Sequence, residues 1–229
     1  MPDGLHDENR PPSAVVEIAA NNEARRNDGT VLSSSGENPW YVLATVAGEQ
    51  RAGGNVAPSR ALHARNRRIW NGWICKDLPV TERAKLAEKL GWSELDFAPL
   101  NAAEMKLLTA RFQAAFGVQD ITAVLPDPKS NIDFSSLFFP CIVFLNQFYF
   151  PNKVDFSTSN FAGPAIFEGA YFEDEVDFRK THFQSAAALV SAHVSGAALF
   201  AETYFEANSV FKDTRFNDYA VFQKAHFHQ

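Results

Sequence analysis

The first question for this chain is whether any of its residues are placed to do chemistry. The sequence contains no Gly-x-Ser-x-Gly turn, no Gly-rich phosphate loop, no His-Glu-x-x-His and no Cys-x-x-Cys. Its two cysteines, Cys75 and Cys141, have no paired spacing and no histidine cluster beside them. We expect buried or partly buried thiols in a reducing compartment, rather than disulfides or a zinc site. We therefore predict no catalytic residue, no bound cofactor and no metal site, and a protein that is not an enzyme.

Three histidines in the C-terminal part of the chain, His182, His193 and His226, occupy equivalent positions in a repeat described below. A repeated histidine could form a metal-binding ladder on the surface. Because no carboxylate recurs beside these histidines, we favour the other interpretation, in which they point outward into solvent.

Acidic residues are most concentrated in one stretch of the chain. Residues 132–229 carry 11 Asp and Glu against 6 Lys and Arg, which gives a charge of −5 out of the total of −6. Lysines and arginines are interspersed among these acids, so an ordinary solvated surface is the favoured interpretation. The candidates for a partner-binding acidic surface are Glu168, Glu173, Asp174, Glu175 and Asp177.

A second charged feature is a run of arginines in a helix predicted over residues 59–76. Such a stripe could meet nucleic acid or an acidic membrane surface. More often it is the wet side of a helix whose large residues, here Trp70 and Trp73, pack inside. It could also dock onto the acidic stretch of the same molecule. The candidates for partner contact are Arg65, Arg67 and Arg68.

The elements that must position these residues divide the chain into three parts. Residues 1–37 are polar and contain no aromatic residue, so we predict a disordered N-terminal segment. Residues 38–131 are predicted to be a small helical domain plus a connector, which contains Pro126 and Pro128. Capping residues and apolar spacing predict its helices near residues 38–47, 59–76, 82–90 and 101–116.

The third part, residues 132–229, carries 18 of the 21 phenylalanines of the chain. Phe or another apolar residue recurs there in two interleaved series, each with a period of 11, so that the spacings alternate between five and six. A small or β-branched residue stands two places before most of these positions. The phenylalanines of this structural ladder are Phe134, Phe139, Phe150, Phe156, Phe161, Phe167, Phe172, Phe178, Phe183, Phe200, Phe205, Phe211, Phe216, Phe222 and Phe227.

An 11-residue period is also compatible with a right-handed coiled coil. Two inward residues that stand two places apart indicate strand alternation instead, and Gly163-Pro164 would break a helix. We therefore predict short strands that form a solenoid with its phenylalanines inside. Leu189 and Val194 replace phenylalanine in one unit, which predicts a narrower or looser rung.

The units Val176-Asp-Phe-Arg-Lys-Thr-His-Phe183 and Ala165-Ile-Phe-Glu-Gly-Ala-Tyr-Phe172 resemble the Phe-centred branch of the pentapeptide-repeat family. The segments Asn38-Pro-Trp-Tyr and Arg65-Asn-Arg-Arg-Ile-Trp-Asn71 resemble a bacterial subgroup with a helical region before the repeats. The resemblance implies a mainly β chain built on a right-handed quadrilateral parallel β-helix of about four to five coils. One extra residue per pair of repeats departs from the strict period of five and predicts a widened corner on alternate faces.

Two functions follow as expectations. The first is a non-catalytic protein-interaction scaffold with an unknown protein partner, in the cytoplasm. The alternative, which the resemblance implies, is a DNA mimic or nucleic-acid-linked regulator that acts on a type II topoisomerase; the modest acidic density makes nucleic-acid-linked roles the less favoured reading.

The apolar stretch Leu137–Leu145 is too short for a membrane span, so none is expected. The sequence stops directly after an inward Phe227 without a polar cap. Such an edge is prone to pairing, which favours an end-to-end homodimer through the C-terminal coil over continuation into a longer array.

Overall fold

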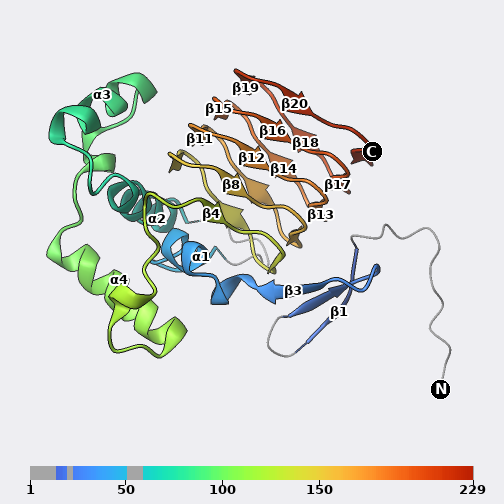
Figure 1. Cartoon of the computed structure of the whole chain (residues 1–229), viewed down its shortest axis with the longest axis horizontal. Helices are drawn as coiled ribbons and strands as arrows, with labels where there is room; N and C mark the ends of the chain where they lie inside the picture. Colours follow the sequence, from blue (N-terminus) through green and yellow to red (C-terminus); the bar gives the residue numbers. More distant parts are fainter. Residues whose placement is uncertain (1–13, 20–22, 51–58, 229) are drawn as a thin grey trace.

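A computed structural model describes residues 14–19, 23–50 and 59–228 of the chain. Its strands from Ile132 onward form a parallel β-solenoid, and its α-helices gather at one end of that solenoid (Figure 1). The chain is therefore mainly β with a small helical region before the repeats, which confirms the predicted fold class.

The solenoid has four faces, each a sheet of very short parallel strands. Paired residues such as Val154 and Val176 are 22 positions apart, so one coil takes two 11-residue units. The first face contains β4 (Ile132–Asp133), β8 (Val154–Asp155), β12 (Val176–Asp177), β16 (Ala198–Leu199) and β20 (Ala220–Val221). The second contains β5 (Leu137–Phe139), β9 (Asn160–Phe161), β13 (His182–Phe183), β17 (Tyr204–Phe205) and β21 (His226–Phe227). The third contains β6 (Val143–Phe144), β10 (Ala165–Ile166), β14 (Ala187–Ala188) and β18 (Ser209–Val210). The fourth contains β7 (Tyr149–Phe150), β11 (Tyr171–Phe172), β15 (His193–Val194) and β19 (Arg215–Phe216).

Two of the four corners are tight turns, and they account for the five-residue spacing. At one of them the Ala170 amide donates to the Phe167 carbonyl at 3.0 Å, and Gly169 between them has φ +62°, as in a type II turn. A left-handed residue costs about 1–2 kcal/mol when it is not glycine, so these corners carry strain. The other left-handed corner residues are Ser136, Gln147, Thr158, Lys180, Ser191, Glu202, Asp213 and Lys224.

The other two corners hold the extra residue of the six-residue spacing, and there successive coils approach closely. At Gly196 a Cβ atom would lie 2.7 Å from backbone atoms of Asp174 and Glu175 in the coil below. Backbone cannot move aside as a flexible side chain can, so glycine is the residue that fits at position 196 of this coil.

Replacing Gly196 with alanine should therefore lower the free energy of unfolding by about 2 kcal/mol, because the new methyl group overpacks a backbone contact. Urea unfolding followed by circular dichroism measures this change. Gly169→Ala is the matched control: its Cβ meets only the Gln147 side chain at 3.4 Å, and the left-handed backbone alone should cost about 1 kcal/mol. Equal costs for the two variants would contradict the close approach.

Phenylalanines fill the interior, as predicted. Two columns of five rings run the length of the solenoid, with neighbouring ring centroids 4.5–5.1 Å apart and nearly parallel planes. This is offset stacking at the rise of one coil. The columns are Phe134, Phe156, Phe178, Phe200, Phe222 and Phe139, Phe161, Phe183, Phe205, Phe227.

The other two interior columns also use phenylalanine, although one of them begins with Leu145, and both carry a smaller residue in the same rung, Leu189 and Val194. Both of these residues are fully buried. The strand pairing of β15 with β11 and β19 continues through this rung without a register shift. The smaller side chains therefore interrupt the ring stacking and leave the backbone ladder intact.

The helical region contains α1 (Pro39–Ala44), α2 (Arg60–Ile74), α3 (Val80–Leu90) and α4 (Ala102–Phe116), with 3-10 turns η1 (Ser35–Glu37), η2 (Glu94–Phe97) and η3 (Ile121–Ala123). The Asn38 side chain accepts a hydrogen bond from the Tyr41 amide, and Asn101 forms a capping box with Glu104. These caps were predicted. The start of α3 was not: it begins at Val80 behind Pro79, slightly earlier than the sequence suggested.

The prediction of disorder for residues 1–37 is wrong for the part that the structure describes; the stretches 1–13 and 20–22 lie outside the described chain. Three strands are formed instead, β1 (Val15–Ile18), β2 (Ala24–Arg26) and β3 (Val31–Ser34). Strand β3 pairs in parallel with β5, and Leu32 packs with Phe138. This polar segment orders because an open edge of the solenoid supplies both its hydrogen bonds and its apolar contact.

Helix α2 closes the same end of the solenoid on the fourth face. The Asn71 side chain accepts a hydrogen bond from the Tyr149 amide at 2.9 Å and donates to the Gln147 carbonyl at 3.1 Å. Trp70 donates to the Tyr149 carbonyl at 2.9 Å. In the next coil the Tyr171 amide donates to a backbone carbonyl, that of Phe148. The side chain of Asn71 thus takes the place of a preceding strand.

The variant Asn71→Ala should lower the free energy of unfolding by about 2–3 kcal/mol, since it leaves a buried amide and a partly buried carbonyl without partners. Chemical denaturation measures the change. Asn146→Ala is the control, because its amide makes only a 3.5 Å contact with Glu168 at the surface. If both variants cost the same, Asn71 does not cap the edge.

Candidate functional site

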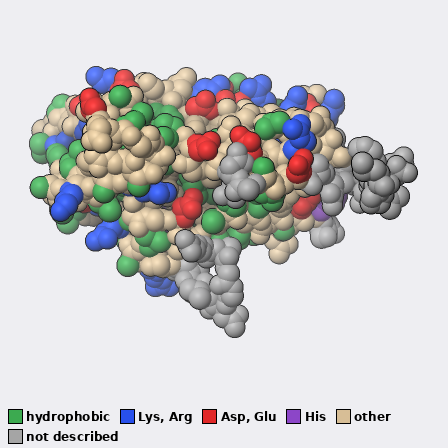
Figure 2. Space-filling view, turned by 90° about the horizontal axis from the view of Figure 1, so that it is seen from below, with side chains coloured by type: hydrophobic (Ala, Val, Ile, Leu, Met, Phe, Trp, Pro, Cys, Tyr) green, Lys and Arg blue, Asp and Glu red, His purple; other side chains and the backbone are tan. Residues whose placement is uncertain are grey.

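The structure separates the acids that the sequence grouped together, and most of them pair within the molecule. Glu173 accepts two hydrogen bonds from Lys89 of α3, at 3.0 and 3.1 Å. Glu175 lies 2.6 Å from Lys153 of the coil below. Acidic and basic side chains are interspersed over the face seen in Figure 2. These pairs leave little unbalanced negative charge at the acidic stretch.

The remaining acids of that stretch have local roles. Asp174 accepts a hydrogen bond from the Glu175 amide at 2.7 Å. Asp177 is fully buried and accepts from the Arg179 amide at 2.9 Å, as well as from its guanidinium. It therefore starts a turn rather than presenting a charge outward. Glu168 is exposed at the corner before Gly169.

The arginine stripe of α2 is mostly structural. Arg67 pairs with Asp96 at 3.1 Å and with the Gln147 side chain. Arg68 bonds to the Pro99 carbonyl and to Glu104, at 3.0 and 3.3 Å. Arg65 is exposed. The stripe therefore fastens the helical region together and onto the first coil, and it does not meet the acidic stretch.

The two tryptophans of α2 pack against the interior, as expected if the arginines form the solvent-facing side of this helix. Trp70 has no exposed surface and contacts Phe134, Phe148 and Phe150 of the first coil. Trp73 donates to the Pro126 carbonyl at 3.0 Å.

The prediction that the repeated histidines point into solvent is wrong for His182, which is fully buried and lies 2.8 Å from Glu206. The ring of Tyr204 in the next coil lies against the His182 ring, with a centroid separation of 5.9 Å. His226 is exposed, and His193 is partly exposed. Among the described residues no group of three or more His, Cys, Asp or Glu is arranged to hold a metal ion.

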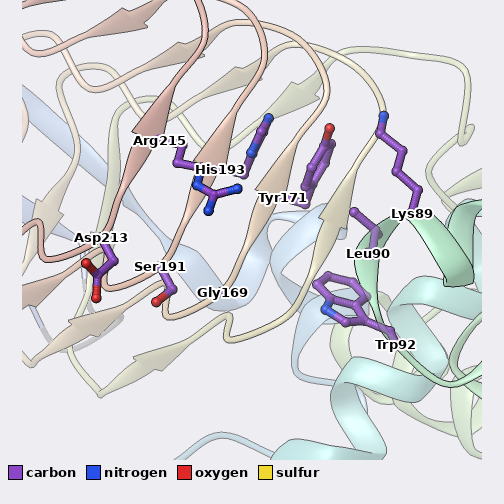
Figure 3. Close-up of a pocket in the computed structure, with 9 residues that line it drawn as sticks. All are labelled: Lys89, Leu90, Trp92, Gly169, Tyr171, Ser191, His193, Asp213 and Arg215. Atoms are coloured by element: carbon purple, nitrogen blue, oxygen red, sulfur yellow. The ribbon is translucent and has the colours of Figure 1, made fainter.

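A groove lies where the helical region meets the fourth face, and we call it the junction groove. It has two neighbouring halves, each of about 380 Å³, which share Gly169 and Ser191. Its upper half, drawn in Figure 3, is lined by Lys89, Leu90, Trp92, Gly169, Tyr171, Ser191, His193, Asp213 and Arg215. Its lower half is lined by His63, Asn146, Gln147, Glu168, Gly169 and Ser191.

The floor of the upper half is a column of outward side chains from successive coils. The rings of Tyr171 and His193 stack with centroids 4.5 Å apart and planes 8° from parallel, and Arg215 follows in the next coil (Figure 3). Lys89 reaches from the end of α3 over the Tyr171 ring, 4.9 Å from its centroid. Helix α3 is thereby held against the second coil while the coils above it stay open.

The burial and the charges around this floor shift the pKa of its histidine, His193. Desolvation, together with the positive charges of Lys89 and Arg215, lowers the pKa of His193 below its ordinary value, although Glu173 acts in the opposite sense. Desolvation also acts to lower the pKa of Lys89, but its hydrogen bonds to Tyr171 and Glu173 prevail and raise it. Lys89 therefore stays charged, paired with Glu173 at 3.0 Å.

The sequence prediction missed this groove. It singled out Glu168 and, as one of the repeated histidines, His193, but neither Tyr171 nor Arg215. One signal was present: the position before each inward residue of the fourth face reads Tyr149, Tyr171, His193 and Arg215. The opposing wall could not be inferred, because Lys89 and Trp92 are brought there only by the docking of the helical region.

None of the helices in the described chain combines the length and the apolar character that crossing a membrane would require. Comparison with protein-family models, with curated proteins and with solved structures finds no match.

Proposed function

We propose that this protein is a non-catalytic interaction scaffold of the pentapeptide-repeat type, which binds a protein partner along the outer surface of its solenoid. The observation that carries the proposal is the filled interior: the inward positions from Ile132 to Phe205 are buried and stacked, so that the coils hold their outward side chains in fixed register. A rigid array of side chains repeated at about 4.8 Å suits recognition of an extended surface.

The helical region supports the same proposal in two ways. It closes one end of the solenoid through Asn71 and Trp70, which keeps the array from pairing there. It also adds a wall to the fourth face and thereby creates the junction groove. We place this scaffold in the cytoplasm, where a buried thiol such as Cys75 stays reduced; burial raises the pKa of that thiol to about 12.

Affinity capture from native lysate tests the proposal. The expected result is one protein that copurifies in a fixed ratio and rebinds when both components are pure. The proposal fails if no captured protein rebinds in purified form, or if the purified chain turns over a substrate.

The alternative function, a DNA mimic or a nucleic-acid-linked regulator of a topoisomerase, gains little from the acidic stretch, since Glu173, Glu175 and Asp177 are paired with cations. A mimic of duplex DNA needs a dense and continuous negative surface. We expect weak or no binding to a type II topoisomerase. Tight capture that weakens steeply with added salt would favour the alternative.

Association of two copies through the last coil stays a prediction. Phe222 and Phe227 are 36% and 53% exposed there, in contrast to the buried rings of the coils below. Light scattering decides the matter: a dimer mass that reverts to the monomer mass in Phe227→Glu is expected, and a monomer at all concentrations contradicts it.

A further inference from the structure

The junction groove has the dimensions of a short stretch of extended chain. The left-handed corner residues along it, Gln147, Gly169, Ser191 and Asp213, come from four successive coils. Three steps of about 4.8 Å give a length of about 14 Å. Four residues of extended peptide span about 13–14 Å.

The two sides of the upper half differ in chemistry. The wall from the helical region offers the apolar side chains Leu90 and Trp92, both partly exposed. The floor offers ring edges and cations, Lys89 above Tyr171 at one end and Arg215 at the other. An occupant therefore needs an apolar side chain toward the helices and an acidic side chain toward the floor.

Arg215 is the cation that an acidic occupant would meet. Its side chain is exposed, and among the residues that the structure describes it has no ion-pair partner within 4.0 Å. By contrast, Lys89 already holds Glu173. At the centre of the floor, desolvation is the main cause of the lowered pKa of His193; Lys89 and Arg215 add to the lowering, and Glu173 opposes it.

We propose that the junction groove binds an extended acidic segment of the partner protein, with a carboxylate at Arg215 and an apolar side chain against Trp92. This proposal rests on the proposed scaffold function and names the chemistry that the scaffold recognises.

A single-stranded nucleic acid fits the groove less well. Base recognition on aromatic platforms requires free ring faces. The lower face of His193 is covered by Tyr171, and Tyr171 itself is covered by Lys89. Glu168 and Asp213 also stand along the groove, so a continuous run of negative charge such as a phosphate backbone is disfavoured relative to a single carboxylate at Arg215.

The test uses a fluorescein-labelled eight-residue peptide of serine with one central glutamate and leucine on either side of it, titrated with the full chain and followed by fluorescence anisotropy. A second peptide with glutamine in place of the glutamate isolates the contribution of the carboxylate. We expect the glutamate peptide to bind at least about tenfold more tightly than the glutamine peptide, the size of effect of one well-placed charge-assisted contact.

Two variants locate the binding. Arg215→Glu should weaken binding of the glutamate peptide by about tenfold, since it removes the attraction and adds a repulsion. Lys224→Glu is the matched control, because it makes the same charge change at an exposed residue of the last coil on a different corner, and it should weaken binding less than about twofold. Gly169→Asn, which a left-handed backbone tolerates, adds a side chain where the halves of the groove meet and should also weaken binding.

Equal binding of the two peptides, or equal loss in Arg215→Glu and Lys224→Glu, would overturn the inference. Binding of a DNA oligonucleotide in the groove, lost in Arg215→Glu, would also overturn it. Failure of the inference and failure of the scaffold are distinguishable. If a purified partner rebinds the Arg215→Glu variant as well as it rebinds the original chain, the groove proposal is wrong and the scaffold proposal stands. If no partner rebinds at all, the scaffold proposal itself is wrong.

Discussion

Replacing Trp70 with alanine should lower the free energy of unfolding by about 3–5 kcal/mol, the usual range for deleting a fully buried aromatic side chain. Trp70 contacts Trp40 in the helical region and three phenylalanines of the first coil, with centroid separations of 5.3–6.5 Å. Trp70 therefore joins the core of the helical region to the core of the first coil. We expect the helical region to melt before the solenoid in this variant, giving two transitions in calorimetry.

Trp70→Phe is the matched control for that experiment. It keeps most of the ring contacts and loses the indole donor to the Tyr149 carbonyl, so it should cost about 1–2 kcal/mol, with a single transition retained. If Trp70→Ala costs no more than Trp70→Phe, the helical region docks through other contacts and the tryptophan is not central to it.

The second large effect is expected at Phe178. Its ring is fully buried and lies between Phe156 and Phe200, at centroid separations of 5.0 and 5.1 Å and with planes 1° and 9° from parallel. Phe178→Ala removes both stacking contacts and opens a cavity in a filled interior, and it should cost about 3–5 kcal/mol. Urea unfolding monitored by circular dichroism measures the loss.

Position along the column supplies the control. Phe227 ends the neighbouring column and is 53% exposed, with one stacked neighbour, Phe205, at 4.7 Å. Phe227→Ala should therefore cost about 1 kcal/mol or less, since little of the ring leaves water on folding. A solenoid held together mainly by its backbone ladder would show similar losses at both positions, and that result would contradict the stacking account.

The solenoid was predictable from sequence because its signal repeats. The alternation of five and six comes from a tight left-handed corner such as that at Gly169, followed by a corner with one more residue, such as that at Gly196. Each inward phenylalanine then falls over its equivalent in the preceding coil. Because the backbone geometry repeats in every coil, the same sequence pattern recurs, and a single substitution such as Leu189 does not obscure it.

The N-terminal strands and the junction groove were not predictable for the same reason: each is formed once. Strand β3 has no apolar alternation of its own and is ordered by the edge of β5. Lys89 meets Tyr171 and Glu173 only because α2 docks on the first coil and α3 follows it. Contacts between non-repeating parts leave no periodic trace in the chain.

The repeating unit described above is half a coil, and this gives the solenoid an approximate twofold screw symmetry. Removing two consecutive units, one whole coil, would shorten the solenoid by one rung and leave every later side chain on its own face. Removing a single unit would preserve the alternation of corners and the inward rings, yet turn everything beyond the deletion by half a revolution. Arg215 would then emerge on the side opposite to Trp92. The core therefore tolerates the removal of one unit or of two. The junction groove, by contrast, keeps its lining only when an even number of units is removed.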